Sequence, residues 1–281
     1  MQKSHLKEMA KCMNKSRNIE WFEKFYSKNF SDVTYTSTQD ADQYVYFLRT
    51  VLFARSVKLG KPDGKFRWPE LKIFDQCCGN GNITMAMASQ LGAEVLGIDL
   101  SKRAIRNARK KFSNIKKLLF KVADAKKFYK SSEFDVVTCW HNSCSYSEYD
   151  AVNMMQLECM SKNLKKNGLL VIDTINQNFI EKNFIESKAR ILDNGTLVGT
   201  WYKLDNNILS STWKTCSKNN VIEEFTGMTK LYSYDKWCKM LAEVGIEVFM
   251  ACGSLEFDQM SDEFGRMILL GIKRKDNESN C

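Results

Sequence analysis

The sequence of 281 residues lacks the features that mark membrane, secreted and zinc-dependent proteins. No apolar run approaches the roughly 20 residues of a membrane-spanning helix, and the start, MQKSHLKEMAKC, lacks the apolar centre of a signal peptide. The ten cysteines are scattered and include no paired C-x-x-C sites, which argues against zinc and for free thiols in a reducing compartment. We therefore expect a cytoplasmic protein with no bound metal and no membrane contact.

Proline is nearly absent. Both prolines, Pro62 and Pro69, fall within KPDGKFRWPE, which predicts a connection between an N-terminal helical part and the first strand of a globular domain. Apolar residues make up 44% of the chain and aromatic residues 12%, as is typical of a packed core. The length allows one large α/β domain with an appended cap.

A strand, a glycine turn and a helix are predicted over residues 71–91. The segment LKIFD ends at Asp75, and Gly79 and Gly81 precede an amphipathic segment over residues 82–91. This order brings the N–H groups of a helix N-terminus beside a ligand, and glycine lets the backbone approach it closely. A second strand ends at Asp99, about 20 residues further on, where a nucleotide-binding fold places the acid that receives ribose hydroxyls.

The third glycine of the G-x-G-x-x-G dinucleotide fingerprint is missing, because Asn82, Ile83 and Thr84 follow Gly81. Asp75 would repel a pyrophosphate, but it would suit a ligand with an ammonium and a sulfonium group. The segments D-x-C-C-G-N-G and G-I-D-L-S resemble the cofactor half of class I S-adenosylmethionine (SAM)-dependent methyltransferases, especially their bacterial small-molecule branch. The resemblance covers about residues 71–273.

The resemblance and the alternation of strands and helices predict an α/β, Rossmann-like fold. We expect a seven-stranded, mostly parallel, doubly wound sheet with helices on both faces. Residues 165–168 are expected to form a turn that ends a helix before the fifth strand, 169–175. Residues 188–231 show strand-like segments with turns at 205–207 and 217–220, which predict a small antiparallel β lid inserted after strand five.

The same pattern divides the chain into five parts. These are an N-terminal helical cap and connection (1–70), a SAM-binding core (71–175), the β lid (176–232), the completion of the core (233–273) and a disordered tail (274–281).

The resemblance also implies the cofactor residues, in order along the ligand. Asp75, Cys77, Gly79 and Gly81 would border the amino-acid end of SAM, Asp99 the ribose, and Leu100, Asp124 and Ala125 the adenine. Trp140 would face the sulfonium. N-terminal helices of this family close over the cofactor with an aromatic hydroxyl, for which Tyr26 and Tyr35 are candidates. Each of these roles has a structural alternative. Asp99 would instead cap a helix, Asp124 would belong to an acidic turn, and the aromatic residues of segment 21–26 would pack in the core.

The segment CWHNSCSYSEYD, residues 139–150, carries the catalytic candidates. His141, one of only two histidines, would act as a general base because its ordinary pKa lies near neutrality, or would instead order the loop. Tyr146 is the second catalytic candidate. Candidates for binding the substrate are Arg49, Asn142 and, in the predicted lid, Tyr202 and Trp213.

We expect methyl transfer from SAM to an oxygen or nitrogen atom of a small metabolite, with secondary-metabolite biosynthesis as a suggested setting. The sequence argues against base-flipping DNA chemistry of the amino-methylating and cytosine-C5 kinds, because their N/D-P-P-Y/F and Pro-Cys motifs need prolines that are absent after Pro69. The net charge of +9 keeps an RNA or protein methyltransferase as an alternative, although the cations between Lys102 and Lys130 fall largely on a predicted solvent face. A non-catalytic SAM-binding protein is another alternative, and both a monomer and a homodimer are compatible with the sequence.

Overall fold

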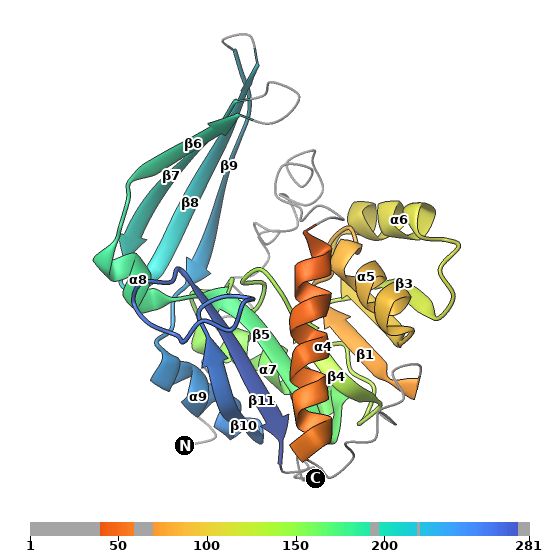
Figure 1. The fold of residues 1–281 in the computed structure, drawn as a ribbon. Helices are drawn as coiled ribbons and strands as arrows, with labels where there is room; N and C mark the ends of the chain where they lie inside the picture. The colour runs from red at the N-terminus through yellow and green to blue at the C-terminus, as the bar shows by residue number, and fades with distance from the viewer. Residues whose placement is uncertain (1–39, 59–69, 192–196, 218–219, 275–281) are drawn as a thin grey trace.

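The computed structural model of the chain describes residues 40–58, 70–191, 197–217 and 220–274 (Figure 1). Tyr26, Tyr35 and the C-terminal tail from residue 275 therefore lie outside the described residues. None of the helices in these ranges is long and apolar enough to cross a membrane.

A seven-stranded sheet forms the centre of the molecule, in the order β10-β11-β5-β4-β1-β2-β3. Strands β1 to β5 run parallel to one another, whereas β11 runs antiparallel to both β5 and β10. This topology confirms the predicted Rossmann-like fold. The strands are β1 (Lys72–Gln76), β2 (Glu94–Asp99), β3 (Leu118–Val122), β4 (Phe134–Cys139), β5 (Leu164–Ile175), β10 (Ile246–Cys252) and β11 (Arg266–Lys273).

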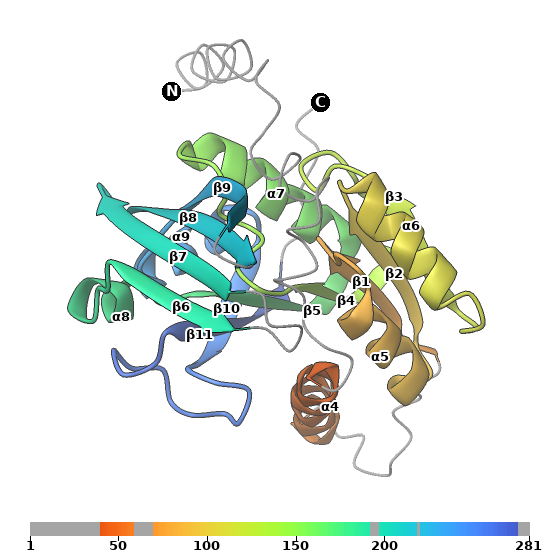
Figure 2. The same ribbon diagram turned by 90° about the horizontal axis from the view of Figure 1, so that it is seen from above.

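Helices cover both faces of this sheet because successive side chains of a strand point to opposite faces. Ile73 of β1 and Val136 of β4 pack in one apolar cluster, whereas their neighbours Phe74 and Val137 pack in the other. The first cluster is shared with α4 (Ala41–Lys58) and α5 (Asn82–Leu91), and the second with α7 (Asp150–Asn163) and α9 (Tyr234–Glu243) (Figure 2). Helix α6 (Lys102–Lys111) packs on β2 and β3 at the edge of the sheet.

A second, four-stranded antiparallel sheet follows β5 and the short helix α8 (Gln177–Lys182). Figure 1 shows it projecting from the core. Asn206 and Asn207 have φ angles of 46° and 63°, so they form the two-residue turn with positive φ that matches the twist of a hairpin. The strands are β6 (Ser187–Ile191), β7 (Leu197–Asp205), β8 (Ile208–Ser217) and β9 (Asn220–Lys230).

The prediction that residues 165–168 form a turn between a helix and the fifth strand is wrong. Helix α7 already ends at Asn163, and β5 begins at Leu164 and includes this segment. The pairing of β4 with β5 shifts register between Phe134 and Val136, and Asn167 has a φ of 63°, so the extra residues are absorbed as an irregularity within the strand. The division of the chain into five parts stays a prediction.

Candidate active site

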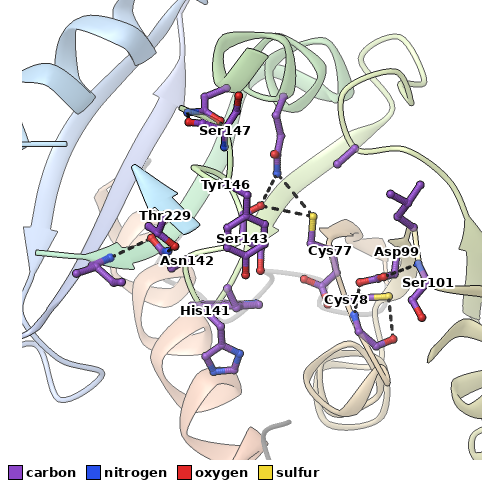
Figure 3. A pocket seen from close by; sticks show the side chains of 18 of the residues that line it. Cys77, Cys78, Asp99, Ser101, His141, Asn142, Ser143, Tyr146, Ser147 and Thr229 are labelled. Atoms are coloured by element: carbon purple, nitrogen blue, oxygen red, sulfur yellow. Dashed lines mark hydrogen bonds between the residues drawn. The ribbon is translucent and has the colours of Figure 1, made fainter. Parts of the chain in front are cut away.

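One cavity of about 400 Å³ lies between the carboxyl ends of the parallel strands and the second sheet. Its lining includes residues that follow β1, β2, β3 and β4, together with residues from one face of β6, β7, β8 and β9. Figure 3 shows part of this lining, from Cys77 and Asp99 to Asn142 and Thr229. In open α/β sheets, ligands bind at this carboxyl edge. The cavity is therefore the candidate site.

The glycine turn after β1 forms one wall of the cavity. Cys77, Gly79 and Gly81 have φ angles of 61°, 54° and 75°, which is the left-handed region where glycine is favoured. A Cβ atom at Gly81 would lie 2.4 Å from Cε1 of Phe120, so the close packing of β3 also demands glycine there. Gly81 caps α5 without any side-chain hydrogen bond, and the first turn of this helix borders the cavity, where the positive end of the helix favours a ligand carboxylate.

Asp99 ties the end of β2 to this glycine turn. Its carboxylate accepts hydrogen bonds from the backbone N–H groups of Gly79 and Ser101, both at 2.8 Å. Burial raises the pKa of Asp99, although these backbone donors favour the charged form. Each carboxylate oxygen offers more than one acceptor direction, so the group retains capacity for a ligand hydroxyl.

Asp75 lies deeper at the end of β1 and is only 1% exposed. Thr84 donates to one carboxylate oxygen at 2.6 Å and Thr138 donates to the other at 2.8 Å. Burial raises the pKa of Asp75 to about 6, in spite of these two hydrogen bonds. This acid is thus held in place by neutral donors and has no cationic partner among the described residues.

At the end of β3, Asp124 accepts from the backbone N–H of Lys126 at 2.9 Å. The adjacent carbonyl of Ala125 accepts from the side chain of Gln76 at 3.0 Å, and Gln156 of α7 in turn donates to Gln76 at 3.0 Å. This chain of amides fixes the floor of the cavity between β1, β3 and α7. Within the described residues, no cluster of three or more histidine, cysteine or acidic side chains is arranged to hold a metal ion.

His141 follows β4, and Figure 3 shows its imidazole directed toward α4, away from Cys77 and Asp99. Its Nε2 lies 2.6 Å from the hydroxyl of Tyr44 in α4. Burial lowers the pKa of His141 and the positive charge of Arg266 adds to this effect, while Asp173 opposes it. The ring is therefore neutral at pH 7.

Asp173 and Arg266 complete a network around this histidine. Arg266 of β11 donates to the Tyr44 hydroxyl at 2.9 Å and pairs with Asp173 of β5 at 3.1 Å. Asp173 also accepts from the backbone N–H of His141 at 3.0 Å. Arginine can only donate, so the described acceptor for the Tyr44 proton is Nε2 of His141, which places the imidazole proton on Nδ1. Service as a general base would then require Nε2 to exchange its hydrogen bond with Tyr44 for the proton of the acceptor.

Asn142 connects the core to the second sheet. Its side-chain N–H donates to Thr229 of β9 at 3.0 Å (Figure 3). Its side-chain oxygen accepts from Thr174 of β5 at 2.8 Å. Asn142 is only 9% exposed. Its amide is thus used to position the second sheet over the cavity.

The structure brings most of the predicted site residues together. Those that line the cavity are Asp75, Cys77, Gly79, Gly81, Asp99, Leu100, Asp124, Ala125, Trp140, His141, Asn142, Tyr146, Tyr202 and Trp213. Arg49 is not among them, because it lies on the exposed side of α4 and donates to the carbonyl of Gln90 at 3.0 Å. Tyr26 lies outside the described residues.

Sequence reasoning missed Tyr44, Asp173, Arg266 and Lys188. Asp173 had a usable signal, since it is another acid near the carboxyl end of a strand, as Asp75 and Asp99 are. Tyr44 and Arg266 had none, because they are 222 residues apart in the chain. Lys188 lines the cavity from β6, the first strand of the second sheet.

Comparisons with known proteins agree with this geometry. A family model described as a methyltransferase domain matches residues 69–245, which is more than half of the chain. The ubiquinone biosynthesis O-methyltransferase of Leptothrix cholodnii is 32% identical over 130 residues, or 43% of this chain and 48% of that protein. The chain spans about half the length of the curated relatives that it matches.

Two solved structures show the same fold over most of the chain. The CcbJ methyltransferase from Streptomyces caelestis has a TM-score of 0.73 at 14% identity, covering 89% of this chain and 98% of that one. An S-adenosylmethionine-dependent methyltransferase from Clostridium acetobutylicum has a TM-score of 0.69 at 15% identity, covering 94% and 100%. At such low identities the likeness is one of fold.

Proposed function

The chain belongs to the methyltransferase-domain family, and from this premise we propose that it transfers the methyl group of SAM to an oxygen or nitrogen atom of a small molecule. One observation carries the proposal. A single cavity joins a glycine turn and three strand-end acids on one side to the aromatic and polar face of a second sheet on the other. The biosynthetic role named for the Leptothrix relative supports a metabolite as the acceptor.

The residues present fit SAM. The first turn of α5 would receive its carboxylate, Asp75 its ammonium end and Asp99 its ribose hydroxyls. Asp124 and Ala125 would border the adenine. When bound, SAM supplies a methyl carbon on a positive sulfur, so that the acceptor's lone pair forms the new bond, the carbon–sulfur electron pair stays on sulfur, and the acceptor's proton passes to a base or water.

The chain's own contribution to the reaction is position and exclusion of water. Trp140 is only 4% exposed at the end of β4, and Tyr202 and Trp213 border the same cavity from the second sheet. Tyr146 and His141 lie on the loop after β4 and are the candidates for contact with the acceptor or its proton. An acceptor enclosed between these walls would be oriented toward the sulfonium before transfer.

The test is calorimetric titration of the protein with SAM and with its demethylated product, S-adenosylhomocysteine. We expect micromolar binding that Asp99→Ala weakens at least tenfold, which corresponds to about 1.4 kcal/mol. Asp235→Ala, which removes an exposed acid in the first turn of α9, should bind as the wild type does. Folded wild-type protein that binds neither ligand would overturn the proposal.

A further inference from the structure

The charged side chains that line the cavity are unevenly distributed. Asp75, Asp99 and Asp124 all stand at the strand ends of the main sheet, where Lys126 accompanies Asp124. Of the described residues, the second sheet contributes one charged group to the lining, the ammonium of Lys188, and no carboxylate. The half of the cavity left for the acceptor therefore carries positive charge.

The pairing of the second sheet directs Lys188 toward the cavity. Lys188 pairs with Thr200 of β7, and Tyr202, two residues along, projects from the same face. The Lys188 ammonium lies 5.4 Å from the centre of the Tyr202 ring, a cation–π contact. No carboxylate among the described residues pairs with Lys188, whereas Lys214, on the opposite face, pairs with Glu224 at 3.0 Å.

Further aromatic side chains line the same cavity. Trp213 of β8 pairs with Thr200 of β7, so it projects from the same face of the sheet as Tyr202. Its ring stacks on that of Phe225, with ring centres 6.3 Å apart. Trp140 lines the cavity from the core. Walls of this kind favour a flat ring over a bulky aliphatic group.

From these observations we propose that the acceptor is a flat hydroxyl compound with an anionic substituent, of the aromatic hydroxy-acid class, and that Lys188 binds the anionic group. The inference rests on the proposed function and narrows it. An amine acceptor would enter mainly as an ammonium ion, which Lys188 would repel and for which this half of the cavity offers no described carboxylate. A hydroxyl group carries no such charge.

The experiment is a calorimetric binding panel with S-adenosylhomocysteine present at saturation. Hydroxybenzoates and dihydroxybenzoates are each compared with the matched benzamide and benzylamine, which keep the ring and the hydroxyls but change the charge. The variants are Lys188→Met and, as the matched control, Lys203→Met, which removes an exposed lysine from the opposite face of the neighbouring strand β7. Thermal melts establish that both variants are folded.

We expect at least one acid to bind about tenfold more tightly than its amide, and the amine to bind most weakly. Lys188→Met should remove the preference for the acid without changing the binding of the amide. Lys203→Met should keep the wild-type preference for the acid. Amides or amines that bind as tightly as the acids, an equal loss for acid and amide in Lys188→Met, or no binding of any acid would overturn the inference. Failure of the proposed function is distinct, because S-adenosylhomocysteine itself would then not bind.

Discussion

Asp75 occupies an environment that opposes its charge. It is buried at the end of β1 with two threonine hydroxyls as its only described side-chain partners, and burial raises its pKa to about 6. Below about pH 4, the carboxyl is protonated in both the folded and the unfolded chain. Between about pH 4 and 6, the folded chain keeps a proton that the unfolded chain has lost, so stability falls as the pH rises.

The substitution Asp75→Asn should therefore stabilise the protein at neutral pH. A shift of about two pKa units corresponds to roughly 3 kcal/mol, which the variant gains progressively between pH 4 and 6, less the cost of rearranging the two threonine hydroxyls. The free energy of unfolding in urea, measured from pH 4 to 8, tests this. The same variant should bind SAM more weakly if Asp75 faces the ammonium end. Parallel stability curves for wild type and variant would show that Asp75 loses its proton over the same pH range in the folded and the unfolded chain, so that burial does not raise its pKa.

The hydroxyl of Tyr44 joins helix α4 to the rim of the cavity. Tyr44 joins His141, on the loop after β4, to Arg266 at the start of β11, and its ring meets Trp140 edge-on with centres 5.0 Å apart. Burial raises the pKa of Tyr44, so the phenol keeps its proton. The helix thus sets which nitrogen of His141 is protonated.

The substitution Tyr44→Phe should release this histidine. We expect a loss of about 1–2 kcal/mol of stability from the broken hydrogen bonds, and a change of the neutral imidazole from the Nδ1–H form to a mixture with the commoner Nε2–H form. Nitrogen-15 NMR of the imidazole reads the two forms, and a His5→Gln background leaves His141 as the single histidine.

Tyr46→Phe on the same helix is the control, because Tyr46 is 66% exposed. An unchanged tautomer in Tyr44→Phe would mean that the loop, and not α4, determines the state of His141.

The elements that could be predicted from sequence are those whose signals are local. Apolar periodicity, together with glycines that the backbone needs, predicts the glycine turn, α5 and β2. The structure has α5 at residues 82–91 and β2 at residues 94–99. The start of β5 could not be predicted, because Leu164 pairs with Phe134 across a register shift that only the folded sheet defines. The use of Asn142 as a link to Thr229 depends equally on distant partners.

At the scale of the whole molecule, the chain has a net charge of +9, but Lys126 and Lys188 are the only lysine or arginine residues in the described lining of the cavity. Helix α6 buries Ala104, Ile105 and Ala108 and presents cations such as Arg106 and Lys110 to solvent. Nucleic-acid binding needs a run of such charges that leads the strand to the reacting atom. The second sheet supplies only Lys188 along the described lining, so the positive charge on α6 does not form part of a track into the acceptor site.

Methyl transfer should therefore be insensitive to the surface charge of α6. With tritiated SAM, we expect label in the small-molecule fraction of a cell extract and none above background in bulk transfer RNA or protein. The double variant Arg106→Glu, Lys110→Glu should leave the small-molecule labelling within about twofold, because both side chains are exposed and neither lines the cavity. Label in RNA that falls steeply with salt and disappears in this variant would instead identify a nucleic-acid methyltransferase, since each released counterion adds to the salt dependence of binding.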